Sequence, residues 1–518
     1  MGIRQGILLA LVFVPVLAAI PVLLVPSGRA VRLTTLIVTI FELALSLVPF
    51  AVFMQPRPDG WLVRLDLSWI PAFGVNFALG LDGISLLMAA LTAFLFMLSV
   101  LVSWDAIRDK SPMFHFMLLV METGVMGVFL STDLFLFYLF WEVMLVPMFF
   151  LIGVWGHGRK VYSAVKFFVY TFTGSLFMLL AIIGLYVIHG SQAGEYTFAL
   201  EALKSTHVEP ATGLWLFAAF FIGFAVKVPV FPIHSWLPDA HTDAPTAGSV
   251  ILAGLLLKTG AYGLIRFGFP LFPEASAAYI PVILAVGIIG VYYAAWIAYA
   301  QEDMKRLVAY SSISHLGFVV LGIAAWNEVS LAGSVLQMVN HGITTGALFI
   351  MVGMLDERRR TRDINAFGGL WAKAPGLSAF FLLFIVSSLG LPGLNNFAGE
   401  LLILVGIFKD YPYLAASALA GVVFTLIYLL RLAQKVLFGP PATDAEFHDL
   451  SPREAAILVP LAVLVVVIGL CPRILIGPIE GPVKALVSPV AAVKTAGATP
   501  QAATAPAQTA AADRGGTP

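Results

Sequence analysis

The sequence predicts an all-α, polytopic membrane protein with about fourteen transmembrane helices. Of its 518 residues, 60% are apolar and only 11% are charged, whereas about a quarter of the residues in a soluble protein are charged. Apolar runs of about 18 to 25 residues recur along the chain, separated by short loops that carry proline, glycine and charge. Each run is long enough to cross the roughly 30 Å hydrocarbon core of a bilayer.

The apolar runs group into four regions of the chain, which a tail follows. Residues 112–267 and residues 278–438 each hold five predicted helices, and three more precede them within residues 1–103. One last helix is predicted at 454–475, and residues 489–518, rich in Ala, Thr, Pro and Gln, are expected to form a disordered tail. The predicted helices lie at 6–26, 30–54, 77–103, 112–131, 133–154, 163–189, 211–233, 247–267, 278–300, 304–325, 330–354, 375–407, 412–438 and 454–475.

The distribution of charge predicts the orientation of the chain. Lys and Arg in the predicted loops are more numerous on one face, which includes the run Arg358–Arg362. By the positive-inside rule this face is cytoplasmic. With an even number of helices, both termini are then expected on the outer, periplasmic side of a bacterial cytoplasmic membrane. A net charge of zero gives no signal of nucleic-acid binding, and the single thiol of Cys471 cannot hold an iron–sulfur cluster.

Four ionisable residues stand inside runs that are otherwise apolar enough to cross a membrane: Glu142, Lys227, Lys258 and Glu400. A charge near the bilayer centre costs roughly 3 kcal/mol on insertion scales. Folding alone does not need this cost, so such groups are expected to be functional. Two acids and two bases along an apolar chain indicate sites where a proton can rest while it crosses a membrane.

These groups can form a proton-conducting path because each one changes the proton affinity of its neighbours. Moving or neutralising Glu142 would change whether Lys227 holds its proton, so the pair is a candidate switch. Lys258 can accept the proton that Lys227 releases, and Glu400 would be the last stop before the opposite face. The alternative is that Glu142 and Lys227 form a static ion pair that holds the bundle together.

Three further groups within the predicted helices are candidates for the same path. His315 and His341 titrate close to neutral pH and could relay protons. Each could instead be a core histidine bonded to a backbone carbonyl. Glu122 lies in the middle of the fourth predicted helix. It could be a relay or a partner in helix packing.

Two predicted helices are interrupted beside a candidate group. In the seventh helix Pro229 and Pro232 follow Lys227, and in the twelfth the Ser-, Gly-, Pro- and Asn-rich stretch 387–396 precedes Glu400. Broken helices free backbone groups that neighbours or water must satisfy, so they tend to line polar cavities. A packing kink is the alternative for each break taken alone.

The positions of these groups also predict an internal repeat. Three pairs of ionisable residues share one sequence offset, 400 − 227 = 173 residues. If helices four to eight repeat as helices nine to thirteen, the odd number of helices per unit inverts the second unit, as in many ion transporters. A coincidence of spacing is the alternative. The pairs are Lys227 with Glu400, Glu142 with His315, and Lys258 with Arg431.

Three stretches of sequence resemble a known family. They are FYLFWEVMLVPMFFLIGVWG (137–156), PIHSWLPDAHTDAPTAGSVILAGLLLKTGAYGLIRF (232–267) and QEDMKRLVAYSSISHLGF (301–318). Together they resemble the antiporter-like membrane subunits of respiratory complex I and of multisubunit cation/proton antiporters, over approximately residues 77–440. The resemblance implies a fold of two inverted five-helix bundles with helices seven and twelve broken.

Within that superfamily the chain most resembles subunit M, the bacterial counterpart of mitochondrial subunit 4. The functional residues of the family fall on Glu142, Lys227, Lys258 and Glu400. A glutamate at the last position is typical of subunit M, whereas subunits L and N and the antiporter relatives usually carry lysine. Subunit L would also extend into a long lateral helix and a further span.

The resemblance implies a proton-pumping subunit of an NADH:quinone oxidoreductase. Such a chain carries no cofactor of its own, and FMN and iron–sulfur clusters are expected in other subunits. Its partners would be the other membrane subunits, especially the neighbouring subunits L and N, and the lipid bilayer. Two alternatives remain: a subunit of a cation/proton antiporter or membrane-bound hydrogenase, and a structural spacer whose charges are static pairs. The sequence leaves open whether the transported ion is H⁺ or Na⁺.

Overall fold

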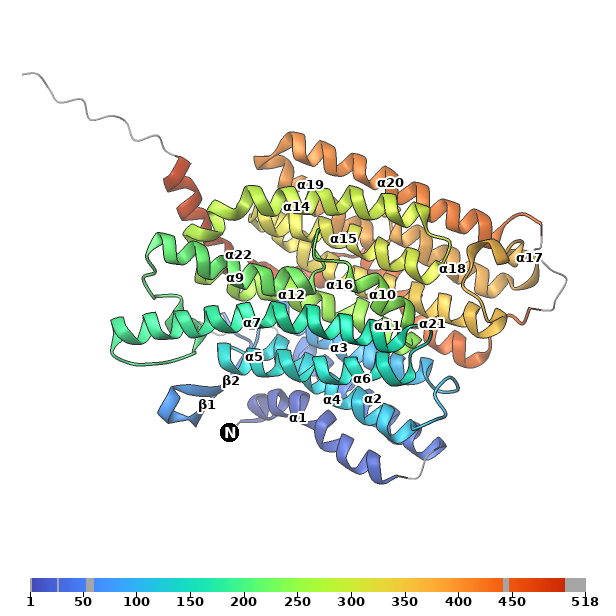
Figure 1. Cartoon of the computed structure of the whole chain (residues 1–518), viewed down its shortest axis with the longest axis horizontal. Helices are drawn as coiled ribbons and strands as arrows, with labels where there is room; N and C mark the ends of the chain where they lie inside the picture. The colour runs from blue at the N-terminus through green and yellow to red at the C-terminus, as the bar shows by residue number, and fades with distance from the viewer. Residues whose placement is uncertain (1, 26–27, 53–59, 441–446, 499–518) are drawn as a thin grey trace, which may run out of the picture.

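The computed structural model describes residues 2–25, 28–52, 60–440 and 447–498. In this part of the chain most of the long helices run roughly along one axis of the molecule, as Figure 1 shows. Thirteen helices there are long and apolar enough to cross a membrane, and each coincides with a predicted run. The predicted all-α polytopic membrane fold is therefore confirmed.

Three of these helices precede the two five-helix regions, as predicted. A β-hairpin that the sequence did not predict lies between the second and the third. Its strands pair antiparallel from Val63↔Leu81 to Ile70↔Val75, and Gly74, with a φ of 63°, ends the short turn. The third helix was expected to begin at residue 77, but Asp82 caps it by accepting from the amides of Ile84 and Ser85. The elements are α1 (Ile3–Leu24), α2 (Arg29–Val52), β1 (Val63–Ile70), β2 (Val75–Leu81) and α3 (Gly83–Val102).

The next segment contains the first predicted five-helix region. The helix expected at 133–154 is divided by a turn at Met144. Pro147 accounts for this turn, because its nitrogen has no hydrogen to donate to the carbonyl one turn earlier. The helix expected at 211–233 ends at Lys227. The elements are α4 (Ser111–Leu130), α5 (Leu134–Val143), α6 (Leu145–Trp155), α7 (Lys160–Ala193), α8 (Leu200–Leu203), α9 (Pro210–Lys227) and α10 (Trp236–Asp243).

The span Thr246–Leu271 is the most deeply buried in the molecule. Every residue of its most apolar window is buried, whereas the corresponding share is 39% for α7. Its hydrogen-bond pattern changes twice from α to π, at Leu252–Leu256 and Leu264–Gly268. The α-helical parts are α11 (Thr246–Ile251), α12 (Leu257–Gly263) and α13 (Phe269–Leu271).

The second predicted five-helix region follows. The helix expected at 375–407 is divided into α18 and α19, each too short to cross a membrane alone, so the structure has thirteen long spans. The segment between the two halves contains Gly390 and Gly393, both with positive φ. The elements are α14 (Pro273–Ala300), α15 (Met304–Ala325), α16 (Glu328–Arg359), α17 (Leu370–Lys373), α18 (Pro375–Ser388), α19 (Asn395–Asp410) and α20 (Pro412–Leu437).

The C-terminal part of the chain differs from the expectation. The last span, α21, covers Pro452–Leu470, and a further helix, α22 (Arg473–Ala498), follows it. Residues 489–498 were expected to be disordered but are helical, because their Ala- and Val-rich sequence continues a helix that already packs against the bundle at Pro478. Residues 499–518 lie outside the described part.

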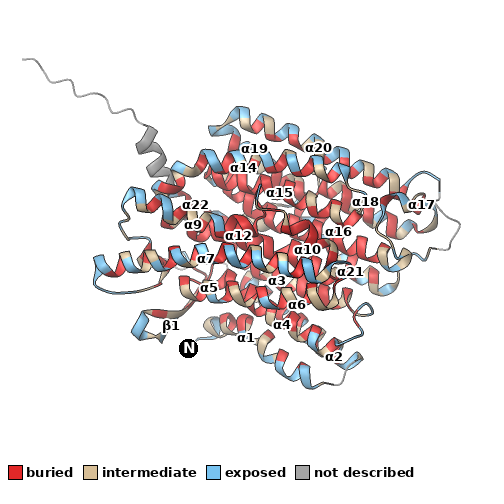
Figure 2. Ribbon diagram, viewed as in Figure 1, coloured by how far each residue is buried: buried red, intermediate tan, exposed pale blue. Residues whose placement is uncertain are grey.

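The core of the molecule is a group of central helices surrounded by helices with one exposed face. Buried residues dominate α3, α12, α15 and α16, and exposed residues follow the outer edges of α7, α14 and α20 (Figure 2). The exposed faces are themselves apolar, as Trp296 and Leu180 show, each 66% exposed. A helix that is apolar on its outer face is stable there when that face meets lipid. Polar groups in the central helices are therefore shielded from lipid by the surrounding helices.

Candidate functional site

A row of four ionisable side chains crosses the central helices. The ammonium of Lys258 lies 2.6 Å from Nδ1 of His341, and the rings of His341 and His315 lie 5.9 Å apart. His315 continues the row through Nδ1, which lies 3.0 Å from Oε1 of Glu400. All four side chains are buried. The row joins residues that are far apart in sequence, and each member can gain or lose a proton.

Lys258 is held where the backbone departs from regular helix. It lies in α12, directly after the first π segment, and its ammonium also donates to the carbonyl of Ala253 within that segment. π segments inside α-helices occur frequently at functional sites. The side chain is completely buried, so its two polar contacts are what make a lysine tolerable there.

The other end of the row has polar neighbours from two helices. Gln337 of α16 donates through Nε2 to Oε1 of Glu400 at 3.1 Å. Ser388, the last residue of α18, lies 3.2 Å from Nε2 of His315 through its hydroxyl. Both nitrogens of His315 therefore have partners, which fixes the orientation of the ring between His341 and Glu400.

The break between α18 and α19 is held by side-chain amides. Asn340 of α16 donates to the carbonyl of Asn395 at 2.7 Å, and Asn395 donates to the carbonyl of Asn340 at 3.2 Å. Ser387 donates to Oδ1 of Asn395 at 2.6 Å. Backbone groups freed by a break inside a membrane must find such partners. This polar network lies less than two turns before Glu400 on α19.

Lys227 and Glu142 form the other candidate pair. Lys227 is the last residue of α9 and is completely buried, and its ammonium lies 5.2 Å from the ring centroid of Trp141. Among the described residues this ammonium has no hydrogen-bond partner. Glu142, next to Trp141 at the end of α5, is half-buried and acts electrostatically on Lys227. A lysine without a direct partner in an apolar site responds strongly to the charge on its neighbour.

A glycine brings this pair close to the row. A Cβ at Gly260 would lie 3.0 Å from Cβ of Lys227 and 2.6 Å from the carbonyl oxygen of Phe224. Gly260 lies two residues after Lys258 in α12. The absence of a side chain at Gly260 lets α9 and α12 touch, and this contact sets the spacing between the two lysines.

Two sequence-predicted groups lie outside the row. Glu122 of α4 is completely buried, and it interacts electrostatically with Glu42 of α2. Arg431, which the offset of 173 residues paired with Lys258, is exposed on α20 and donates to the carbonyl of Tyr299. The offset therefore does not place Arg431 at a position equivalent to that of Lys258.

Sequence reasoning missed two buried basic groups near the row. His241 falls between the predicted helices at 211–233 and 247–267, but it is buried in α10 with its ring stacked 4.4 Å from that of Phe349. The ammonium of Lys305, at the start of α15, donates to the carbonyl of Ala244. Lys258 and Lys305 both act electrostatically on His241. The available signal was the Pro and Asp pattern around His241, which is typical of a short helix inside a loop.

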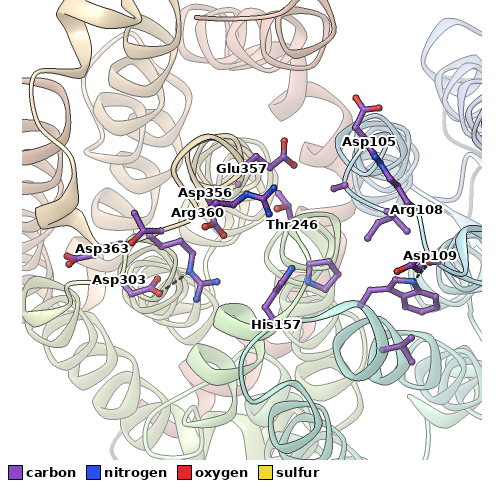
Figure 3. Close-up of a pocket in the computed structure, with 18 of the residues that line it drawn as sticks. Asp105, Arg108, Asp109, His157, Thr246, Asp303, Asp356, Glu357, Arg360 and Asp363 are labelled. Atoms are coloured by element: carbon purple, nitrogen blue, oxygen red, sulfur yellow. Dashed lines mark hydrogen bonds and ion pairs between the residues drawn. The ribbon is translucent and has the colours of Figure 1, made fainter. Parts of the chain in front are cut away.

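A large polar vestibule opens at the end of the bundle where α4 and α7 begin. Its volume is about 1460 Å³, and acidic residues outnumber basic ones in its lining. Figure 3 shows Asp303, Asp356 and Thr246 around it. Thr246 is the first residue of the span that carries Lys258. Burial, together with the nearby charge of Lys305, lowers the pKa of His157 in this lining.

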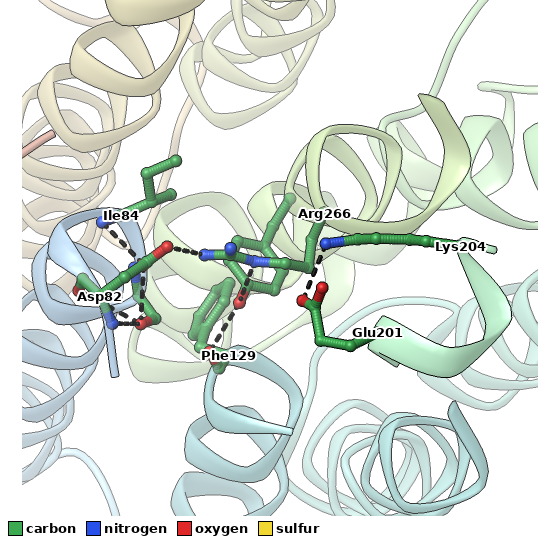
Figure 4. Close-up of polar contacts among 8 residues, drawn as sticks. Asp82, Ile84, Phe129, Glu201, Lys204 and Arg266 are labelled. Atoms are coloured by element: carbon green, nitrogen blue, oxygen red, sulfur yellow. Dashed lines mark hydrogen bonds and ion pairs between the residues drawn. The ribbon is translucent and has the colours of Figure 1, made fainter. Parts of the chain in front are cut away.

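A buried ion pair at the opposite end of the Lys258 span has a structural role. Arg266 lies 2.5 Å from Oδ2 of Asp82 and donates through Nε to the hydroxyl of Tyr262 at 3.2 Å. Tyr262 in turn donates to the carbonyl of Phe129 at 2.8 Å (Figure 4). These contacts tie the start of α3 and the end of α4 to the second π segment. No group of the row takes part in them.

The sequence matches one family model and many named proteins. The model, described as NADH:quinone oxidoreductase/Mrp antiporter, TM, matches residues 131–427. NADH-quinone oxidoreductase subunit M of Pseudomonas aeruginosa is 49% identical over 429 residues, which are 81% of this chain and 84% of that protein. NADH-ubiquinone oxidoreductase chain 4 of Arabidopsis thaliana is 40% identical over 90% of this chain and 93% of its own length.

Solved structures show the same fold. A chain of respiratory complex I from Thermus thermophilus with bound NADH superposes with a TM-score of 0.83 at 32% identity, over 93% of this chain and 99% of that chain. A chain of the Mrp complex from Dietzia sp. DQ12-45-1b has the same TM-score, 0.83, over 95% of this chain and 100% of its own, but only 21% identity. At that identity the likeness concerns the fold alone.

Proposed function

This chain belongs to the NADH:quinone oxidoreductase/Mrp antiporter family and, within it, to the subunit M (chain 4) group, and we propose that it moves protons across the membrane through its central row. The observation that carries the proposal is the contact sequence Lys258, His341, His315 and Glu400. A static structural role does not require four titratable groups in sequence inside an apolar bundle.

The row transfers protons by short steps between neighbouring groups. Lys258 donates to His341 across a hydrogen-bond distance, and His341 passes the proton to His315. Glu400 accepts from His315 and releases the proton through the break between α18 and α19. Gln337 and Ser388 keep the two receiving groups in position.

Glu142 and Lys227 act as the switch of this path. When Glu142 is charged, its field favours the protonated form of Lys227; when Glu142 is neutralised or moves, Lys227 releases its proton toward Lys258. The contact of Gly260 with Lys227 supports proton transfer from Lys227 to Lys258, because it brings α9 against α12. Energy would enter here through neighbouring subunits, since Glu142 is only half-buried within this chain.

Protons enter the row from the vestibule. Its acidic lining raises the local concentration of cations. Thr246 lines the vestibule, and His241 interacts electrostatically with both Lys305 and Lys258. We assign His241 as the group that delivers protons from the vestibule to Lys258 and His341.

The proposal includes the arrangement of the chain in its assembly. The segments α4 to α13 and α14 to α20 are two inverted repeats whose broken helices, α9 with α10 and α18 with α19, meet the row. Both termini lie on the periplasmic side; α1 begins and α22 lies at the same end of the molecule (Figure 1), which supports this. Subunits L and N flank the chain, and FMN and iron–sulfur clusters are held by other subunits.

Proton translocation by the purified complex in vesicles tests the function. Replacing His341 by Gln should abolish acidification driven by NADH while assembly is retained. Full pumping in this variant would reject the row. Copurification with membrane proteins alone, without flavin and iron–sulfur subunits, would instead make the chain a subunit of a cation/proton antiporter.

A further inference from the structure

A second cluster of ionisable groups lies between α2 and α4, outside the central row. Glu42 and Glu122 are both completely buried, and all four of their carboxyl oxygens are without a hydrogen-bond partner among the described residues. Glu42 acts electrostatically on Glu122, and the helices that carry them, α2 and α4, pack against each other. Leu43, next to Glu42, and Met126, one turn after Glu122, pack together with Ala89 and Ala93 of α3.

The neighbouring hydroxyl groups do not satisfy these carboxyls. Thr39 and Ser46 lie on the same buried face of α2 as Glu42. Each donates its hydroxyl proton to a carbonyl of its own helix, at 3.1 and 2.8 Å. The oxygen of Thr123, next to Glu122, has no partner among the described residues. Among the described residues, no hydroxyl group therefore donates a hydrogen bond to either carboxyl.

The adjoining helices do not supply a base to this cluster. Helix α3 has no ionisable residue, and α1 has Arg4 alone, in its first turn. Lys258 and Tyr262 of α12 have the partners described above, His341 and Phe129. Glu142 of α5 acts electrostatically on Lys227 of α9. Two unpaired carboxylates side by side in this environment would cost several kcal/mol.

Two basic side chains lie between the cluster and the vestibule: His115, and Arg32, which donates to the carbonyl of Ile107 in the vestibule lining. His115 is on α4 two turns before Glu122, and its Nδ1 is 2.8 Å from the carbonyl of Ser111, so the neutral ring donates there. Its Nε2 is then an acceptor, and it has no partner among the described residues. Arg32 of α2 acts electrostatically on His115. Residues 105–110, just before α4, line the vestibule.

We infer that Glu42 and Glu122 form a second, peripheral proton-binding site, separate from the central row, and that its protons arrive from the vestibule past His115. Protons neutralise both carboxyls without further ligands. A metal cation would need several more oxygens, and the hydroxyls of Thr39 and Ser46 are engaged with their own helix. The site stores protons beside the path and does not depend on the role of the central row.

Carbodiimide labelling of the intact, purified complex tests the site, because dicyclohexylcarbodiimide attacks protonated carboxyls in apolar surroundings. We expect label on Glu42 or Glu122 at neutral pH, mapped by peptide mass spectrometry, that decreases as pH rises and is insensitive to Na⁺. Protection by Na⁺ but not by K⁺ would show a metal-cation site and overturn the proposal. Absence of label on both residues, with label on Glu400 as positive control, would also overturn it.

Infrared spectroscopy of the same complex gives an independent readout. The stretching band of protonated carboxyls should lose part of its intensity in Glu42→Gln and part in Glu122→Gln. In the double variant the loss of intensity should equal the sum of the two single losses. Glu201→Gln, which changes an exposed glutamate paired with Lys204, should leave the band unchanged. An unchanged band in the double variant would show that the pair holds no proton.

The role of His115 is tested by exchange in D₂O. His115→Gln should slow the deuterium shift of the Glu42 and Glu122 band severalfold without removing the band. An unchanged exchange rate would exclude the route past His115. The outcomes differ from those for the central row, because all of them can be measured without turnover.

Discussion

The ammonium of Lys258 lies 2.6 Å from Nδ1 of His341, between residues 83 positions apart in the sequence. Two basic groups at this distance cannot both be protonated without strong repulsion, because their charges would interact in a site of low dielectric. At most one of the two groups is therefore expected to be protonated at a time. In the proposed path, a proton moves between them when the balance of charge around the pair changes.

Lys258→Ala should reduce NADH-driven proton translocation at least about tenfold, which corresponds to about 1.4 kcal/mol. The substitution removes the donor to His341 and leaves the rest of the bundle in place. Acidification of vesicles, normalised to the amount of assembled complex, measures the effect. Lys204→Ala, at an exposed surface pair with Glu201, is the matched control and should pump normally.

Glu142→Gln and Lys227→Ala should each lower pumping and NADH:quinone turnover strongly without loss of assembly. Because the two groups act as one unit, the double variant should be no worse than the more severe single variant. Measuring turnover and proton translocation of the wild type and the three variants gives a double-mutant cycle for this pair. Normal pumping in both single variants would reject the switch. If the losses of the single variants add in the double variant, the two residues act independently.

Pumping should fall in the order wild type, Glu400→Lys, Glu400→Ala, with Glu400→Gln close to alanine. Lysine keeps a titratable group at the end of the row, whereas glutamine keeps an acceptor for Gln337 but cannot take a proton from His315. Reconstituted vesicles provide the measurement. If the alanine variant pumps as well as the wild type, Glu400 is not on the exit path.

Gly260→Ala should reduce both pumping and the thermal stability of the complex, with overpacking costing roughly 1–3 kcal/mol. The added methyl group would lie 2.6 Å from the carbonyl oxygen of Phe224 and 3.0 Å from Cβ of Lys227. Gly290→Ala is the control, because nothing lies within 4 Å of a Cβ there. Equal behaviour of the two variants would mean that the contact between α9 and α12 does not set the position of Lys227.

Arg266→Met should destabilise the chain by about 3–5 kcal/mol, because it leaves Asp82 buried and unpaired. Adding Asp82→Asn should recover much of the loss, since asparagine still caps α3 and carries no charge. Thermal unfolding of the detergent-solubilised complex compares the variants. A double variant as unstable as the single one would show that Arg266 contributes by packing on Trp61 and Tyr262.

The sequence predicts the helices well and their interruptions less well. An apolar run determines where a helix crosses, so α15 (Met304–Ala325) has the predicted bounds. The hairpin of β1 and β2 was not predicted, since its apolar strand β2 runs directly into the apolar start of α3. The π segments around Lys258 cannot be predicted from the hydropathy of the sequence.

The members of the row can be found from the sequence, but their contacts cannot. An isolated charge in an apolar run identifies Lys258 and Glu400, whereas the pairing of Lys258 with His341 depends on how α12 and α16 pack. Glu42 stands in FELALSLV, the same kind of setting as the other buried charges. Applied to every run, the rule that identified Glu122 would have identified Glu42 too.

The two π segments that flank α12 make the Lys258 span adjustable. A π turn accommodates one residue more than an α turn, and converting it to α rotates the following residues by about 100° around the helix axis. Such a rotation would carry the ammonium of Lys258 away from His341 while the helix ends stay in place, one of them anchored by Arg266 to Asp82. If the row conducts protons as proposed, the two π segments would allow the contact between Lys258 and His341 to be made and broken by rotation within one span.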